Sequence, residues 1–307
     1  MKTDVKVDKK IVLMFVFVFA AIGFFLLAHF LLNAGSTTDY QASASGALLE
    51  AIKTDNQPQL PVRPTSPSLS ARAAIAVNIG SESEDKILYQ KNLDEKLPIA
   101  SLVKLMTALV VFQKYDISQV VLVSPKAMEQ EGEQGDLQAG QILSVKDLLY
   151  ITLIESSNRA AFALSEVIGN DRFIKLMNDN AQKLGLSNTY YHDVTGLDDK
   201  SYSTARDIAT LSKYLFLRYP LFDQIVSSGS YNLYSPDGSF HHDLATTNQL
   251  LGHDGIVGGK TGFTVEAKQC YMVIDKKSAN DYNINVVLGS DDRFSDMDNL
   301  INFLNDQ

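Results

Sequence analysis

Ser101 and Lys104 are the residues that most directly suggest a chemical reaction. They stand three residues apart at the start of an apolar stretch that predicts a helix, so both side chains share one helical face. A serine hydroxyl is a weak nucleophile and needs a neighbouring base. A lysine serves as that base only when desolvation or a nearby cation lowers its pKa. Alone the pair is a weak signal, because a capping serine and a solvated lysine have the same spacing.

Two further segments add polar groups that suit the same chemistry. One follows an apolar stretch at 148–154, where capping a helix is the alternative function for its serines and asparagine. The other lies in a predicted strand at 255–264, where a glycine weakens the strand unless a ligand or another backbone approaches closely. An ordinary edge strand is the alternative for that segment. The two segments are Ser156-Ser157-Asn158 and Lys260-Thr261-Gly262.

Together, the three segments match the S-x-x-K, S-x-N and K-T-G signature of penicillin-binding proteins and serine β-lactamases. From about residue 73 to 304, the sequence most closely resembles the D-alanyl-D-alanine carboxypeptidases of the low-molecular-mass penicillin-binding protein group. The stretches that carry this resemblance are PIASLVKLMTA (98–108), GLDD (196–199), STARD (203–207), TNQLL (247–251) and GGKTGFT (258–264).

The resemblance implies a catalytic role for three residues. Ser101 would attack the carbonyl between two D-alanines, and Lys104, held neutral, would take its proton. Ser156 would sit between Lys104 and Lys260 and pass a proton towards the leaving amine. The backbone N–H groups of Ser101 and Phe263 would form the oxyanion hole.

The resemblance also implies a set of substrate-binding residues. Asn158 would bind a peptide amide of the substrate. Lys260 would lower the pKa of Lys104 and attract a terminal carboxylate, to which Thr261 would donate a hydrogen bond. Arg293 is a further candidate for this carboxylate, with an exposed charge on a turn as the alternative. The full set is Asn158, Lys260, Thr261, Gly262, Phe263 and Arg293.

Some positions depart from the family's usual pattern without removing a catalytic group. Val103 stands where threonine is frequent, Arg159 where an acid is common, and Lys268 where a small residue is expected. These departures bear on substrate preference or rate, and the sequence does not say which.

Four other functions compete with the carboxypeptidase. A DD-endopeptidase, which cuts peptidoglycan cross-links, shares all three motifs and stays open. A β-lactamase of the common class uses a loop glutamate, whereas Glu166, on an apolar helix, is the only glutamate between the second and third motifs. A β-lactam antibiotic is therefore expected to acylate Ser101 and remain. A non-catalytic peptidoglycan-binding protein is expected to lose Ser101 or a lysine, and a Ser-His-Asp hydrolase to have a G-x-S-x-G elbow.

Composition excludes other classes of function. The chain of 307 residues has a net charge of −9 and no basic stripe, so we expect no nucleic-acid partner. The histidines form no zinc spacing and Cys270 is the single cysteine, so we predict no metal, cofactor or disulfide. Cys270 itself lies on an apolar strand and is interpreted as a small core residue.

The N-terminal segment predicts membrane attachment. Residues 11–33 form an apolar segment long enough to cross a bilayer, and four lysines precede it. This pattern predicts a cytoplasmic tail (1–10), a single transmembrane anchor (11–33), a Pro- and Ser-containing linker (34–71) and an extracytoplasmic enzyme domain (72–307) that faces the peptidoglycan. A cleaved signal peptide is the alternative, although its apolar region is typically shorter, about 7–15 residues.

The remaining patterns predict an α+β fold in the enzyme domain. Two strands precede a long helical stretch, and three strands and a helix follow it. We therefore expect an antiparallel five-stranded sheet flanked by helices, with a helical lobe, as in β-lactamases and penicillin-binding transpeptidases. The predicted strands are 73–79, 86–92, 255–264, 269–276 and 283–288, and the predicted helices are 102–112, 145–154, 160–168, 204–217 and 295–304.

Overall fold

The computed structural model describes residues 66–80, 85–132 and 134–307, which belong to one compact unit, Pro64–Gln307. The predicted tail (1–10) and anchor (11–33), with most of the linker, lie outside the described residues. Within the described ranges, no helix is both long and apolar enough to cross a membrane. The architecture below concerns the described residues alone.

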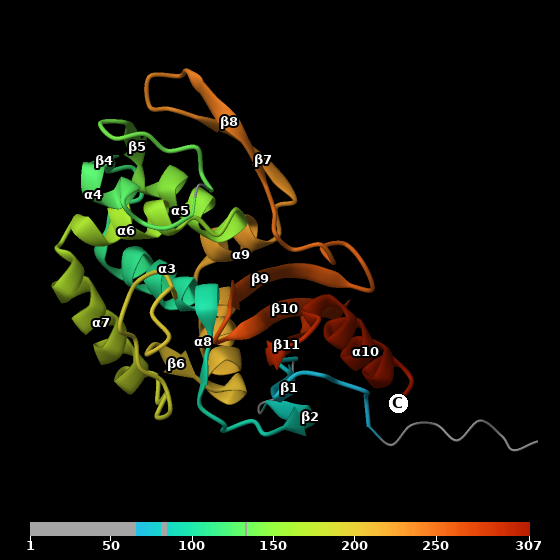
Figure 1. The fold of residues 1–307 in the computed structure, drawn as a ribbon. Coiled ribbons are helices and arrows are strands. Elements are labelled where there is room, and N and C mark those ends of the chain that lie inside the picture. The colour runs from blue at the N-terminus through green and yellow to red at the C-terminus, as the bar shows by residue number, and fades with distance from the viewer. Residues whose placement is uncertain (1–65, 81–84, 133) are drawn as a thin grey trace, which may run out of the picture. The chain divides into compact units, whose positions relative to one another are not determined.

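A five-stranded antiparallel sheet forms the centre of the unit, as the sequence predicts (Figure 1). Its strand order is β2-β1-β11-β10-β9, so the first two strands of the chain pair with the last three. The strands are β1 (Ala73–Asn78), β2 (Lys86–Lys91), β9 (Ile256–Thr264), β10 (Lys268–Ser278) and β11 (Asp281–Ser290). The strand that carries the K-T-G segment, β9, is the terminal strand on the side of the helical lobe.

Both faces of the sheet are buried because its side chains alternate between two hydrophobic clusters. Ile75, Met272 and Val286 belong to the larger cluster, on the face covered by α8 (Ala205–Arg218). Tyr271 and Val273 belong to the smaller cluster, beneath α10 (Arg293–Asn305). The K-T-G strand, β9, therefore pairs with a strand, β10, whose side chains are packed on both faces.

The helical lobe lies between β2 and β9 in sequence. The predicted helices are confirmed with small shifts of their ends, and the nucleophile segment begins as the short 3-10 helix η1 (Ala100–Leu102). The lobe consists of α3 (Val103–Lys114), α4 (Pro125–Met128), α5 (Val145–Ile154), α6 (Asn158–Glu166), α7 (Asn170–Lys183) and α9 (Pro220–Val226). Buried apolar residues of α3, α5, α6 and α8 belong to the larger cluster.

Several elements were not predicted from the sequence. These are α7, the short helices α4 and α9, and three two-stranded sheets, of which β7–β8 projects from the lobe (Figure 1). The small strands are β3 (Leu97–Pro98), β4 (Val120–Leu122), β5 (Ile142–Ser144), β6 (Tyr202–Ser203), β7 (Ser230–Tyr234) and β8 (Phe240–Ala245).

The last residues assigned to the linker contact the folded unit. The buried carboxylate of Asp296 in α10 accepts hydrogen bonds from the backbone N–H groups of Ser70 (2.8 Å) and Ala71 (2.7 Å). Leu69 packs against the smaller cluster. This attachment brings the chain into β1 at a fixed position, while the exact domain boundary stays a prediction.

Candidate active site

Ser101 lies in a backbone turn against which two glycines pack. The preceding residue, Ala100, has a left-handed backbone with φ 47°, and its carbonyl oxygen faces Gly196. A Cβ atom on Gly196 would lie 1.9 Å from that oxygen, and one on Gly262 would lie 3.0 Å from the Ser101 nitrogen. Two glycines from distant segments thus allow their backbones to pack directly against the nucleophile turn.

Lys104 is fully buried beside Ser101. Its Nζ lies 2.9 Å from Ser101 Oγ, 2.6 Å from Asn158 Oδ1 and 2.7 Å from the carbonyl oxygen of Thr195. Burial lowers the pKa of Lys104 to about 7, and the negative charge of Asp193 acts in the opposite direction. A substantial fraction of Lys104 is therefore neutral at pH 7, which meets the requirement for a base.

The second motif divides its residues between structure and chemistry. Ser157 caps α6, accepting a hydrogen bond from the Ala160 N–H (3.2 Å), so the capping function expected for this segment belongs to the middle residue. Ser156 has a left-handed backbone with φ 64° and lies 2.7 Å, Oγ to Nζ, from Lys260. Asn158 reaches Lys104 on the other side. The left-handed backbone of Ser156 accompanies this divergence, in which the Ser156 side chain reaches Lys260 and the Asn158 side chain reaches Lys104.

Lys260 is the second buried lysine. Its Nζ donates to Ser156 Oγ and to the carbonyl oxygen of Thr261 (2.9 Å). Burial, followed by repulsion from Lys104 and Arg293, lowers the pKa of Lys260 well below its usual value. We expected Lys260 to lower the pKa of Lys104; in the structure burial does this, and the repulsion is evident on Lys260.

The other predicted binding residues surround the same edge of β9. Thr261 Oγ1 lies 2.6 Å from Thr247 Oγ1, which comes from the segment after β8. Arg293 is half-buried, and its Nη1 donates to the carbonyl oxygen of Gly262 (2.8 Å), so it supports the strand rather than standing on a turn. Phe263 is 60% exposed and leaves its ring available for contact.

Asp193 is a site residue that lies outside the three motifs. Its carboxylate accepts hydrogen bonds from the N–H groups of Thr195 (3.1 Å), Gly196 (2.7 Å) and Leu197 (3.0 Å), and from the Ser201 hydroxyl. This single carboxylate shapes the loop whose Thr195 carbonyl receives Lys104. Its negative charge also acts to raise the pKa of Lys104. Asp193, which precedes Thr195-Gly196, is typical of a turn. The sequence does not indicate that this turn lies beside Lys104.

The positions that depart from the family pattern lie around the site. Val103 is buried in the core, and Arg159 Nε donates to the Gln130 carbonyl oxygen (3.4 Å). Lys268 forms an exposed ion pair with Asp291 (2.7 Å). Cys270 is buried and unpaired, which confirms its place in the core. In the described parts of the chain, no group of three or more His, Cys, Asp or Glu side chains is arranged to hold a metal ion.

This fold, with a serine beside a buried lysine and a second serine–lysine pair opposite, defines a serine acyl-transfer enzyme of the penicillin-binding protein type. Residues 60–292 match the D-alanyl-D-alanine carboxypeptidase family, peptidase family S11. The chain belongs to this family.

Individual relatives agree with this assignment. The D-alanyl-D-alanine carboxypeptidase DacF of Bacillus subtilis is 36% identical over 67% of this chain and 54% of its own length, so the chain spans about half of that relative. A D-alanyl-D-alanine endopeptidase of Pseudomonas aeruginosa is 32% identical over 73% of both chains. The crystal structure of the Streptomyces K15 DD-transpeptidase aligns with a TM-score of 0.73, 27% identity, 80% of this chain and 100% of that one.

Replacing Asp193 tests how its charge acts on Lys104. Acylation of Ser101 requires neutral Lys104, so its rate should fall as pH drops below about 7 in the wild type. Asp193→Asn removes the charge that raises the pKa of Lys104, so the acidic limb should move to lower pH. The measurement is the pH dependence of the acylation rate by a chromogenic β-lactam.

Asp198→Asn is the matched control, because Asp198 pairs with His192 (3.5 Å) on the same loop and does not contact Lys104. Its acidic limb should coincide with that of the wild type. An Asp193→Asn limb that stays in place, or moves to higher pH, would contradict the proposed charge effect.

Proposed function

We propose that this protein is a serine-type D-alanyl-D-alanine carboxypeptidase that trims peptidoglycan stem peptides through an acyl-enzyme on Ser101. The observation that carries the proposal is the contact of 2.9 Å between Ser101 Oγ and the buried, readily deprotonated Lys104. Membership of the D-alanyl-D-alanine carboxypeptidase family supports the choice of substrate. No cofactor enters the proposed reaction.

Acylation follows from the positions of the two serine–lysine pairs. Ser101 Oγ attacks the carbonyl carbon of the penultimate D-alanine, and its proton passes to Lys104 Nζ. The C–N bond then breaks, and the proton taken up by Lys104 passes through Ser156, which contacts Lys260, to the leaving nitrogen, so that Lys104 is neutral again. One D-alanine departs, and the rest of the peptide stays as an ester on Ser101. The backbone N–H groups of Ser101 and Phe263 are the proposed oxyanion hole.

Hydrolysis of the ester completes the cycle. Water gives a proton to neutral Lys104 as it adds to the ester carbonyl. The bond to Ser101 Oγ then breaks, and Oγ recovers the proton from Lys104. A β-lactam antibiotic forms the same ester but keeps its leaving nitrogen attached. Glu166 accepts a hydrogen bond from Ser124 (2.6 Å) at the start of α4, so its carboxylate is already engaged in the helical lobe. This supports a slowly hydrolysed β-lactam adduct and disfavours a β-lactamase.

The terminal strand β9 supports binding of an extended peptide. An edge strand offers backbone groups that can pair with a substrate strand, and β9 runs directly beside the nucleophile turn. The terminal carboxylate of the substrate would accept a hydrogen bond from Thr261 and would favour the charged form of Lys260 nearby. Asn158 is proposed to bind a substrate amide, with its side-chain amide already oriented by Lys104 and the Glu131 carbonyl oxygen (2.8 Å).

A DD-endopeptidase is the second candidate. The observation that favours it is the similarity to the Pseudomonas aeruginosa D-alanyl-D-alanine endopeptidase, which extends over 73% of both chains. Both reactions use the same acyl-enzyme and differ in what leaves: a free D-alanine or a second peptide. Measuring D-alanine release from a pentapeptide against cleavage of a cross-linked dimer separates them.

We propose that the enzyme works outside the cell membrane, held by residues 11–33 with the N-terminus in the cytoplasm. The apolar length of that segment and the four preceding lysines support this placement. Recovery of the full chain in the soluble fraction of lysed cells would contradict it.

Mass spectrometry after incubation with benzylpenicillin tests the proposed nucleophile. One penicillin should add to the peptide that contains Ser101, and Ser101→Ala should carry no adduct. Lys104→Ala should slow adduct formation by about 10²–10⁴-fold, because a positioned base contributes a factor of this size.

Circular dichroism serves as the control, since both variants should keep the helical and sheet content of the wild type. An adduct on another residue, or a Lys104→Ala variant that acylates at the wild-type rate, would refute the proposed mechanism.

A further inference from the structure

The hydroxyl of Thr261 meets the hydroxyl of Thr247, a residue outside the three motifs. The two Oγ1 atoms lie 2.6 Å apart, and this distance alone does not fix which of them donates. Thr261 is only 4% exposed, so water has little access to its hydroxyl and protein groups decide its hydrogen bonds. The catalytic steps above assign Thr261 to the substrate carboxylate and leave Thr247 without a function.

The count of protons decides the direction of this hydrogen bond. A hydroxyl has one proton and donates one hydrogen bond. If Thr261 gave its proton to Thr247, it would present only lone pairs to an incoming carboxylate. A bond from Thr261 to the carboxylate therefore requires Thr247 to donate to Thr261. In that direction the two hydroxyls form a chain, in which the first bond polarises and strengthens the second.

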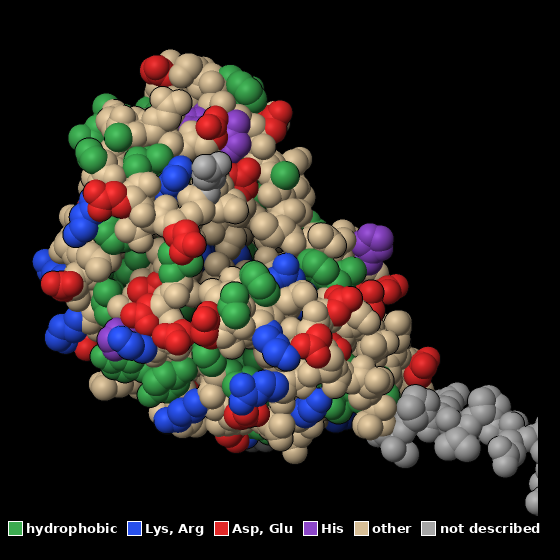
Figure 2. Space-filling view, in the orientation of Figure 1, with side chains coloured by type: hydrophobic (Ala, Val, Ile, Leu, Met, Phe, Trp, Pro, Cys, Tyr) green, Lys and Arg blue, Asp and Glu red, His purple; other side chains and the backbone are tan. Residues whose placement is uncertain are grey.

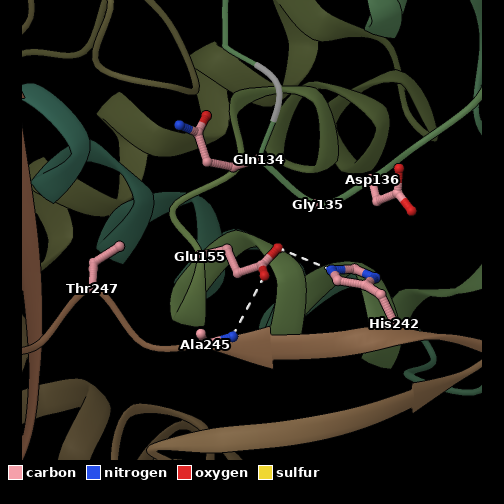
Figure 3. A pocket seen from close by; sticks show the side chains of 7 residues that line it. All are labelled: Gln134, Gly135, Asp136, Glu155, His242, Ala245 and Thr247. Atoms are coloured by element: carbon pink, nitrogen blue, oxygen red, sulfur yellow. Dashed lines mark hydrogen bonds and ion pairs between the residues drawn. The ribbon is translucent and has the colours of Figure 1, made fainter.

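The segment after β8 holds Thr247 against the end of α5. The Thr247 N–H donates to the carbonyl oxygen of Ile154, the last residue of α5 (3.2 Å). Two residues earlier, the Ala245 N–H donates to Glu155 Oε1 (3.4 Å), and Figure 3 shows Thr247 on the coil beyond Ala245. The segment that carries Thr247 is therefore bound to the chain that leads directly into Ser156.

Asn248 anchors the same segment to the sheet. Its side chain is buried, and Oδ1 accepts from the hydroxyl of Tyr271, which is fully buried in β10, and from the Leu250 N–H (3.2 Å). A Cβ atom on Gly259 would lie 3.0 Å from Asn248 Nδ2, so the loop lies directly against β9. Contacts with α5, β9 and β10 thus fix the position from which the Thr247 hydroxyl acts.

We infer that Thr247 is a positioning residue for recognition of the substrate carboxylate. Its hydroxyl donates to Thr261 and so directs the Thr261 proton outwards, to the carboxylate. The surface drawn in Figure 2 is hollowed between the helical lobe and β9, which gives a ligand access to this side of the site. The inference rests on the proposed function and deepens it, because it adds a residue that acts through Thr261.

Benzylpenicillin and its methyl ester test this inference, because they differ only in the carboxylate. Mass spectrometry follows acylation of Ser101 by each compound and gives the ratio of the two rate constants, carboxylate to ester. In the wild type this ratio should be about ten or more, as expected for a hydrogen bond to a charged group. Loss of folded protein or of the base affects both rates alike and cancels in the ratio.

Variants of Thr247 show whether its hydroxyl acts through Thr261. Thr247→Val keeps the shape and should lower the ratio about fivefold, the effect of one hydrogen bond, whereas Thr247→Ser should retain the wild-type ratio. In a Thr261→Val background, adding Thr247→Val should lower the ratio no further. Thr246→Val is the matched control: it removes the neighbouring hydroxyl, which accepts from the Asn248 N–H (3.1 Å), and should retain the wild-type ratio.

The outcomes separate the inference from the proposed function. A wild-type ratio in Thr247→Val would overturn the inference, as would a further loss in the double variant or an equal loss in Thr246→Val. A penicillin adduct on Ser101 in any of these cases would leave the proposed function intact. Absence of an adduct from both compounds in the wild type would refute the proposed function, and the inference with it.

Discussion

Burial of the Lys104 amine beside Ser101 is the constraint on which the rest of the site depends. An isolated ammonium is costly to bury, and a charged lysine is no base. The protein surrounds Nζ with three oxygen atoms, from Ser101, Asn158 and Thr195, which satisfy it in either protonation state. These three atoms come from three separate segments of the chain. The helical lobe and the Asp193 loop must therefore both be folded before the base exists.

The sheet supplies the K-T-G residues of the site through its terminal strand β9. Strand β9 reaches the nucleophile turn because Gly262 has no side chain to hold it away, and Arg293 fixes its carbonyl oxygen from α10. Lys260 then lies opposite Lys104, with Ser156 between the strand and the lobe. Repulsion from Lys104 and Arg293 adds to burial in lowering the pKa of Lys260, whereas burial lowers the pKa of Lys104. The same strand presents an open edge to an extended substrate.

The sequence was sufficient for the parts of this site that short motifs specify. Lys104 contacts Ser101 and Asn158, Lys260 contacts Ser156, and the two lysines are close enough to repel. The five strands and main helices lie where periodicity placed them. Asp193 was missed because Lys104, on which its charge acts, is 89 positions away, and no local pattern encodes that proximity. By contrast, α7 was detectable, since Phe173, Met177 and Ala181 recur every four residues on its buried side. The β7–β8 hairpin likewise has a Pro-Asp-Gly turn signal at 236–238.

Direct titration of the Lys104 amine is the most direct test of this account. The signal of an isotope-labelled lysine side chain can be followed by NMR as pH is raised, and assigned by its loss in Lys104→Ala. Burial predicts a midpoint near pH 7, about three units below an exposed lysine. A midpoint above pH 9 would show that Lys104 stays charged at neutral pH, and would contradict its function as the base for Ser101.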